Sequence, residues 1–553
     1  MERFWIKSYA PGVPADVDVD AFSSVGEMFD RSVEKFGNNA AFVQMGATMT
    51  FAELDRFSRA FGGYLQGELK LERGVRIALM MPNVLQYPIA LLGALRGGYV
   101  VVNCSPLYTA RELQRQLADS GAEAILVLEN FASVVQQALP NTALKHVIVT
   151  QLGDLLGPVK GTVTNFIVKR VKRLVPEWRI AQAVPFHSAL RKGSSLPWRA
   201  VDVAPSDIAF LQYTGGTTGT PKGAALTHRN IIANLQQHHA HCASRLEEGR
   251  TVVITAIPLF HIYAMISSLL GLKIGATNVL IPNPRDIRGL TKELKRRRFS
   301  CFPGVNALFK ALLDCPDFAK VDFSNLRLAA VGGAPLEEEV ARKWKTITGN
   351  TIVEAYGLTE TSPVVACNLM DVAEFTGCCG VPLPSTEIAI RDDEGADLPI
   401  GQAGELCVRG PQVMKGYWNR PLETRAAMTA DAFFRTGDIA TIDERGFLRI
   451  VDRKKDMINV SGMKVYPTEV EEVAMMHPGV AEAAVIGVPD ALSGETVKIV
   501  IVARDPSLTA ADVIAHCRNY LAGFKTPRQV EFRGGLPKTA LGKVLRRGLR
   551  QTI

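Results

Sequence analysis

The clearest chemical signal in the sequence is a segment rich in glycine and threonine, Tyr213-Thr-Gly-Gly-Thr-Thr-Gly-Thr-Pro-Lys-Gly223, which follows an apolar run. Glycines let backbone N–H groups approach an anion, the hydroxyls add donors, and Lys222 supplies a compact positive charge. The segment is not a Walker A loop, because Pro221 stands where that motif has glycine and Gly223 follows the lysine. A surface turn of the same composition is the structural alternative. We predict a polyphosphate-binding loop whose contributors are Tyr213, Thr214, Gly215, Gly216, Thr217, Thr218, Gly219, Lys222 and Gly223.

This loop resembles the phosphate-binding loop of the adenylate-forming superfamily, which contains acyl-CoA synthetases, luciferases and nonribosomal adenylation domains. A second segment, Glu354-Ala-Tyr-Gly-Leu-Thr-Glu-Thr361, is similar to another motif of that family. The resemblance implies that Tyr356 and Gly357 lie against adenine, that Thr359 lies near phosphate, and that Glu360 binds Mg²⁺ together with Thr217. An aromatic face suits a purine, and a hard carboxylate suits Mg²⁺.

Three further segments complete the resemblance around the nucleotide. Val331-Gly-Gly-Ala-Pro-Leu336 resembles the adenine-pocket loop, which implies close backbone approach at Gly333 and Ala334, although the glycines could serve only a tight turn. Thr436-Gly-Asp438 resembles the element whose aspartate binds both ribose hydroxyls, and Arg453 matches an arginine that reaches the same sugar. A carboxylate suits a vicinal diol because both hydroxyls can donate to it.

The C-terminal region carries the remaining catalytic expectation. Pro537-Lys-Thr-Ala-Leu-Gly-Lys-Val-Leu-Arg-Arg547 resembles the family's last motif, in which Lys543 matches the catalytic lysine. The resemblance implies a C-terminal domain that rotates about Lys455 after adenylation. It also implies that Ser461, Gly462 and Lys464 then line the channel for CoA.

The subfamily signal lies between Asp431 and Lys455, where the chain is similar to the signature of fatty acyl-CoA synthetases and resembles the bacterial long-chain enzymes. The chain departs from that signature in one place, because Ala432-Phe433 stands where Gly-Trp is usual. In Pro258-Leu-Phe-His-Ile-Tyr263, His261 matches a family histidine beside the acyl carboxylate, although an isolated histidine among apolar residues is more often part of a core. The implied reaction joins a long-chain fatty acid to CoA through an acyl-AMP, with consumption of ATP.

Other interpretations of the sequence assign a different acid, a different acceptor of the acyl group, or no reaction at all. A fatty acyl-AMP ligase would deliver its product to a carrier protein, an amino-acid or aryl-acid adenylation domain would activate another acid, and a luciferase-like oxygenase would share the adenylation half. A membrane-bound fatty-acid binding module with a decayed ATP site is the non-enzymatic reading. The intact Lys222, Glu360, Asp438, Arg453 and Lys543 disfavour decay.

The elements that must hold these residues follow from the hydrophobic pattern. Short apolar runs alternate with helical patterns at Val75–Met81, Tyr99–Asn103, Ala124–Leu128, Val147–Thr150, Val252–Ile257 and Leu326–Val331, which predicts helix-covered parallel sheets with ligand loops at the strand ends. Strand-like pieces after about residue 380 predict a small β-rich subdomain over 380–452. We expect an α/β N-terminal adenylation domain of two helix-covered sheets over residues 1–454 and a small mobile α+β domain over 455–553.

Composition narrows the partners and the location. The net charge of +8 over 553 residues is too diffuse to indicate nucleic acid. The nine cysteines are scattered without a C-x-x-C pair, so the sequence indicates neither a zinc site nor a disulfide framework. This use of cysteine is typical of a protein in a reducing cytoplasm. No uninterrupted apolar stretch reaches the roughly 18 to 20 residues of a spanning helix. A homodimer is one possible assembly, although the sequence does not give the oligomeric state.

A basic amphipathic segment over residues 161–175 is the candidate contact with a membrane. On a helical period Val163, Phe166, Ile167, Val171 and Leu174 share one side, while Lys169, Lys172 and Arg173 point elsewhere. Such a pattern indicates peripheral binding to anionic lipids, here at the inner face of the cytoplasmic membrane. A solvated basic helix packed on the body is the alternative, and we favour that alternative for a second cluster, Lys295-Arg-Arg-Arg298.

Overall fold

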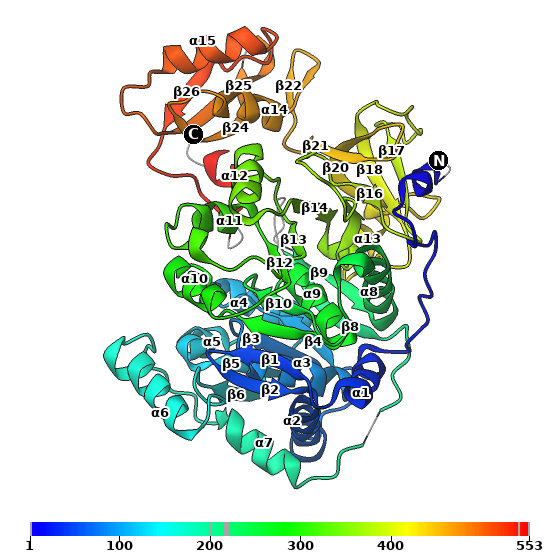
Figure 1. The fold of residues 1–553 in the computed structure, drawn as a ribbon, viewed down its shortest axis with the longest axis vertical. Coiled ribbons are helices and arrows are strands. Elements are labelled where there is room, and N and C mark those ends of the chain that lie inside the picture. Colours follow the sequence, from blue (N-terminus) through cyan, green and yellow to red (C-terminus); the bar gives the residue numbers. More distant parts are fainter. Residues whose placement is uncertain (1–2, 200, 215–220, 491, 540–541, 551–553) are drawn as a thin grey trace.

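Two large sheets and the helices around them form the body of the chain (Figure 1). The computed structural model describes residues 3–199, 201–214, 221–490, 492–539 and 542–550. One sheet has the order β19-β9-β8-β4-β3-β5-β6-β7, and its strands are β3 Arg76–Met80, β4 Val100–Asn103, β5 Ala124–Leu128, β6 His146–Thr150, β7 Val184–Pro185, β8 Ile208–Thr214, β9 Lys222–Thr227 and β19 Gly416–Tyr417. The pairs from β8 through β7 are parallel, whereas β9 and β19 add antiparallel strands at the edge.

The second sheet has the order β16-β15-β14-β13-β12-β10-β11-β1-β2 and is parallel from β14 through β1. Its strands are β1 Ala40–Gln44, β2 Ala47–Thr50, β10 Val252–Thr255, β11 Thr277–Leu280, β12 Cys301–Gly304, β13 Leu328–Val331, β14 Ile352–Gly357, β15 Val364–Cys367 and β16 Val381–Pro382. Both sheets therefore present the ends of parallel strands, where loops can bind ligands.

Helices cover these sheets and also lie in the core. Their bounds are α1 Val25–Phe36, α2 Phe51–Gly63, α3 Gln86–Arg96, α4 Ala110–Ser120, α5 Ala132–Ala138, α6 Pro158–Phe166, α7 Phe186–Ser194, α8 His228–Cys242, α9 Ile262–Lys273, α10 Ile287–Lys295, α11 Asn306–Leu313, α12 Glu338–Thr348 and α13 Pro421–Ala427. Every residue of α3 is buried, as are nearly all of α9, and one hydrophobic cluster joins both helices to strands of both sheets. A helix that is apolar all round belongs in such an interior position.

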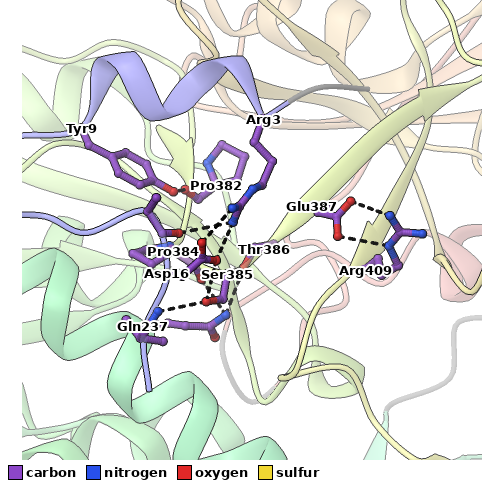
Figure 2. Close-up of polar contacts among 12 residues, drawn as sticks. Arg3, Tyr9, Asp16, Gln237, Pro382, Pro384, Ser385, Thr386, Glu387 and Arg409 are labelled. Carbon is purple, nitrogen blue, oxygen red and sulfur yellow. Dashed lines mark hydrogen bonds and ion pairs between the residues drawn. The ribbon is translucent and has the colours of Figure 1, made fainter. Parts of the chain in front are cut away.

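A small antiparallel sheet follows along the chain, with the order β17-β18-β20-β21 and the bounds β17 Glu387–Arg391, β18 Gly404–Arg409, β20 Phe434–Ile442 and β21 Leu448–Arg453. The N-terminal segment is fixed to this region (Figure 2): Arg3 pairs with Asp16, Asp16 accepts a hydrogen bond from Ser385, and the Tyr9 hydroxyl donates to the carbonyl oxygen of Pro382. Trp5 is fully buried in the same core.

The last sheet has the order β23-β22-β25-β24 with β26 beside β25 (top of Figure 1). Its elements are β22 Ile458–Val460, β23 Met463–Val465, α14 Pro467–Met475, β24 Val480–Asp490, β25 Gly494–Ala503, α15 Ala510–Tyr520, β26 Gln529–Phe532 and α16 Arg546–Arg550. It has its own hydrophobic core.

The predicted architecture of helix-covered sheets, a β-rich subdomain and a smaller α+β unit is confirmed. The domain limits at 454/455 and 380–452, and the mobility of the last unit, stay predictions. Among the helices of the described residues, none is long and apolar enough to cross a membrane.

Candidate active site

The ends of the predicted phosphate loop are held by an antiparallel pair of strands. β8 and β9 pair with Tyr213 opposite Gly223 and Thr214 opposite Lys222. The loop residues Gly215, Gly216, Thr217, Thr218 and Gly219 lie outside the described residues. The Tyr213 hydroxyl donates to Asp119 over 2.7 Å, and burial and this bond raise its pKa, so the phenol stays neutral.

Glu360 and Lys222 approach a common partner that the motifs did not indicate. Glu360 lies in the single turn η7 (Thr359–Thr361), and its Oε1 accepts a hydrogen bond of 2.8 Å from the Tyr417 hydroxyl. The Lys222 ammonium lies 5.0 Å from the centre of the Tyr417 ring. Only Lys222 and Glu360 were predicted, because a lone tyrosine far along the sequence has no distinguishing spacing.

The carboxylate of Glu360 fits a Mg²⁺ ion that also binds substrate phosphates. Burial raises the pKa of Glu360, and the hydrogen bond from Tyr417 and the positive charge of Arg453 offset only part of this shift. No group of three or more His, Cys, Asp or Glu side chains among the described residues could hold a metal by itself. Mg²⁺ usually takes only one or two protein carboxylates and completes its shell with phosphate and water, so the donor set suits that ion.

Three residues predicted from separate motifs to surround the nucleotide contact one another. Asp438 on β20 and Arg453 on β21 face one another in the strand register, and the Arg453 Nε lies 2.7 Å from Asp438 Oδ1. The other oxygen, Oδ2, accepts a 2.6 Å hydrogen bond from the Tyr356 hydroxyl at the end of β14. Burial, followed by the charge of Asp438, raises the pKa of Tyr356 far above its ordinary value, so the hydroxyl remains a donor.

The glycines near adenine have separate structural reasons. Gly333 has φ +80°, which favours glycine in the loop after β13. Gly357 is packed so closely that a Cβ would lie 2.1 Å from the carbonyl oxygen of Pro363. Ala334 follows Gly333 in the same loop, and Thr359 is half-buried beside Glu360. Gly333 and Ala334 thus lie in the loop after β13, and Gly357 and Thr359 lie at the end of β14 and in η7, close to Tyr356 in the sequence; packing alone accounts for Gly357.

His261 caps the buried helix α9. Its Nδ1 accepts a hydrogen bond of 3.3 Å from the backbone N–H of Tyr263, and burial lowers its pKa to about 4. The ring is therefore neutral near pH 7, and its remaining proton lies on Nε2, which is available to donate.

Lys543 from the C-terminal unit lies near Arg453 and Asp438. Burial lowers its pKa to about 8, followed by the positive charge of Arg453, while Asp438 acts in the opposite direction. The preceding Gly542 has φ +80°, and a Cβ there would lie 2.8 Å from the Cβ of Ala307 in α11. The C-terminal unit is thus docked against the body with its lysine inserted.

A cluster of ion pairs holds that arrangement. Arg546 lies 3.1 Å from Asp452 in β21, 3.5 Å from Asp456 and 2.7 Å from Glu471 in α14. The predicted hinge residue Lys455 lies among these groups, and its buried Nζ has no hydrogen-bond partner, so burial lowers its pKa.

The predicted CoA-channel residues do not join the nucleotide site. Ser461 and Gly462 form the tight turn between β22 and β23, with φ of +52° and +85°. Lys464 lies 3.0 Å from Asp393 in the turn after β17. No hydrogen bond or ion pair links Lys464 to Glu360, Asp438 or Lys543, all of them described.

An apolar pocket lies against the buried helix α9. It is enclosed by α8, α9, β10, β12 and β13, and its walls include Cys242, Val253, Tyr263, Ser267, Leu270 and Ile274. The Tyr263 hydroxyl donates to the carbonyl oxygen of Ala330 over 3.2 Å. A Cβ at Gly332 would lie 3.4 Å from the Tyr263 ring, so this ring separates the pocket from the adenine loop.

Comparison with known proteins shows full-length likeness. A family model described as AMP-binding enzyme matches residues 29–418, and one described as AMP-binding enzyme C-terminal domain matches residues 469–543. The long-chain-fatty-acid–CoA ligase of Yersinia pestis is 52% identical over 551 residues, covering 100% of this chain and 98% of that protein.

Two solved structures of MatB from Rhodopseudomonas palustris, both 28% identical and both covering 96% of this chain and 99% of their own, differ in how well they match. The ATP-bound structure superposes with a TM-score of 0.82, and the apo structure with a TM-score of 0.72. Identity and coverage are the same, so the difference lies in conformation.

Proposed function

Because the chain belongs to the AMP-binding enzyme family, we propose that it converts a long-chain fatty acid, ATP and CoA into acyl-CoA, AMP and pyrophosphate through an acyl-adenylate. The observation that carries this function is the full-length likeness, at 52% identity, to a long-chain-fatty-acid–CoA ligase. The contacts that Tyr356 and Arg453 make with the carboxylate of Asp438 support this function. The chain is an acid–thiol ligase that uses ATP and CoA as co-substrates.

Adenylation comes first because a carboxylate is a poor acyl donor. The substrate carboxylate attacks the α-phosphate in line and displaces pyrophosphate, a step that depends on positioning and on stabilisation of charge. Lys543 and Lys222 supply positive charge, and His261 donates its Nε2–H to the carboxylate. Glu360 and Thr217 would hold Mg²⁺, which supplies further charge neutralisation on the polyphosphate when bound.

The nucleotide adds its own contacts to those that these side chains already make with one another. Asp438 accepts hydrogen bonds from the ribose hydroxyls, Arg453 keeps that carboxylate in place, and the Tyr356 ring lies against adenine beside Gly333 and Ala334. We assign binding of the polyphosphate to the phosphate loop from Tyr213 to Gly223.

Thioester formation requires a second arrangement of the chain. We assign residues 1–454 to the adenylation domain, with a β-rich subdomain over 380–452, and residues 455–553 to a mobile domain that rotates about Lys455. Rotation withdraws Lys543 and releases Lys464 from Asp393. It brings Ser461, Gly462 and Lys464 to the site, where they line the CoA channel. The better superposition on ATP-bound MatB supports the present arrangement as the one for adenylation.

The apolar pocket beside α9 receives the acyl tail. Tyr263 in its wall lies two residues after His261, to which we assign the carboxylate, and apolar walls favour hydrocarbon by about 0.8 kcal/mol for each buried CH₂. Tyr263 must move aside for the tail to enter, because its ring lies between the pocket and Gly332.

Helix α6 suits contact with a membrane surface, and we propose that surface as the source of the fatty acid. The helix and the turn that follows it, η4 (Ile167–Val171), leave apolar side chains in solvent, with Val159 77% and Phe166 60% exposed. Arg170, Lys172 and Arg173 are exposed beside them. This combination suits peripheral binding to anionic lipids at the cytoplasmic membrane. Lys169 is less available to lipid headgroups than the sequence pattern predicted, because it pairs with buried Glu129 over 2.5 Å.

Vesicle co-sedimentation tests this surface. The wild-type chain should bind anionic vesicles and release them in high salt, whereas the triple variant Arg170→Gln, Lys172→Gln, Arg173→Gln should bind several-fold less. The matched control neutralises Lys295, Arg297 and Arg298, which already pair with Asp317, Glu293 and Asp322. Equal binding by the triple variant and the wild type would remove the membrane assignment.

The activity is tested with purified chain, ATP, Mg²⁺, CoA and a series of fatty acids from short to long. CoA-dependent release of AMP that is greatest with long acids is the expected result. Accumulation of acyl-AMP without thioester would instead indicate a carrier protein as acceptor, and absence of turnover would indicate a binding module.

A further inference from the structure

Tyr417 contacts two groups of opposite charge that come from different elements. Its hydroxyl donates to Glu360 Oε1 over 2.8 Å, and its ring lies 5.0 Å from the Lys222 ammonium. Glu360 follows β14, whereas Lys222 opens β9 after the phosphate loop. One side chain therefore sets the position of both.

The backbone around Tyr417 is fixed on several sides. β19 pairs with β9, which places Tyr417 opposite Ala224, and the backbone N–H of Trp418 donates to the Gly223 carbonyl oxygen over 2.7 Å. The Tyr417 N–H donates to Thr424 Oγ1 over 2.9 Å. The backbone of Met414 also binds the carbonyl oxygen of Glu360 over 2.8 Å. This rigid support is what a positioning side chain requires.

Neither charged group has an ion-pair partner in the described part of the chain. A direct pair of Lys222 with Glu360 would neutralise both charges that a polyphosphate and its cation need. The aromatic ring holds the ammonium by a cation–π contact while the hydroxyl holds the carboxylate. Both charges thus stay oriented and separate.

We propose that Tyr417 is a positioning residue that keeps the Lys222 ammonium and the Glu360 carboxylate apart and oriented for ATP with its Mg²⁺. This inference rests on the proposed function, because it assigns those two groups to the polyphosphate and the cation.

Two substitutions separate the two contacts. Tyr417→Phe keeps the ring near Lys222 and removes the bond to Glu360, whereas Tyr417→Leu removes both. Tyr9→Phe is the matched control, because the Tyr9 hydroxyl also donates to a single partner, the carbonyl oxygen of Pro382, but at the subdomain (Figure 2). Binding is measured by calorimetry with ATP in EDTA and with ATP in Mg²⁺, and KM and kcat are measured separately.

Tyr417→Phe should bind ATP in Mg²⁺ about 10-fold more weakly, with KM rising in parallel, and should bind ATP in EDTA within about 2-fold of the wild type. Tyr417→Leu should weaken both by about 10-fold or more, and Tyr9→Phe should change neither. Wild-type binding of ATP in Mg²⁺ by Tyr417→Phe would overturn the proposal, as would equal losses in EDTA and in Mg²⁺. If Tyr417→Leu does not fold, Tyr417→Phe decides alone. Formation of acyl-CoA by the wild-type chain is measured separately, so failure of the proposed function can be distinguished from failure of the positioning role of Tyr417.

Discussion

Polar side chains around the nucleotide site already hold one another, whereas the pocket between α8 and α9 is lined mainly by apolar side chains with few fixed contacts. Asp438 is held by Tyr356 and Arg453, and Glu360 is held by Tyr417. In the pocket, Tyr263 closes the entrance with a single hydrogen bond to Ala330. The first region is organised before its ligand arrives, and the second can adapt its walls.

The difference has a physical reason in the two ligands. Stabilisation of charge in a transition state requires dipoles and charges that do not reorganise during the reaction. A hydrocarbon tail gains free energy from burial in proportion to area, without direction. Replacements in the nucleotide region should therefore lower rates steeply, and replacements in the pocket should change which acid is used.

The largest effect is expected from Lys543→Ala. Loss of its charge should lower adenylation, measured by exchange of pyrophosphate into ATP, by about 100- to 1,000-fold. Thioester formation from supplied acyl-AMP should stay within a few-fold, because the second arrangement withdraws this lysine. Lys538→Ala is the control, because the Lys538 ammonium pairs with half-buried Glu482. Equal loss of both half-reactions would contradict the rotating domain.

Filling the pocket should change which fatty-acid lengths are used and should leave the chemical steps unaffected. Ser267→Phe adds a ring to the α9 wall and should exclude about three or four methylenes, which lowers kcat/KM for long acids by about 60- to 200-fold. Short acids should react at nearly the wild-type rate, and Ser267→Ala should change little. A uniform loss across the fatty-acid series would show that the tail binds elsewhere.

The pH dependence should also separate the two half-reactions. Lys543 is charged below its pKa of about 8 and neutral above it, so kcat/KM for ATP should fall about 10-fold for each unit of pH above 8. Arg453 and Arg546 lower this pKa, and Asp438 and Asp456 raise it. Thioester formation from acyl-AMP should lack this limb, and the same limb in Lys543→Ala would assign it to another group.

The smallest effect is expected at the departure from the fatty acyl-CoA synthetase signature. Ala432 has φ +65°, a left-handed conformation that strains a side chain, where the signature has glycine. Ala432→Gly should raise the free energy of unfolding by up to about 1 kcal/mol and leave activity unchanged. Phe433, which stands where the signature has tryptophan, is buried, with Arg391 and Arg409 over its ring at 4.8 and 4.4 Å. Unchanged thermal stability of Ala432→Gly would indicate that the loop is not strained.

The proposed nucleotide region has local motifs in the sequence and the pocket has none, for the same physical reason. Tyr356, Asp438 and Arg453 each lie in a local motif, and strand register brings them together. Most predicted strands were found within a few residues, as at Ala124–Leu128. The pocket walls come from five elements, and Tyr417 acts through a tertiary contact, so neither leaves a local pattern. The arrangement that inserts Lys543 and leaves Lys464 on Asp393 depends on domain packing, which a motif does not encode.

The central claim, that the fatty acid is joined to AMP before CoA attacks, is tested most directly with a long-chain acid labelled with ¹⁸O in both carboxylate oxygens. After turnover with ATP and CoA, mass spectrometry of the products should find one labelled oxygen in AMP and none in pyrophosphate, because the attacking oxygen stays on the α-phosphate when the thiol displaces AMP. Label in pyrophosphate or inorganic phosphate, or unlabelled AMP accompanying acyl-CoA, would contradict the account.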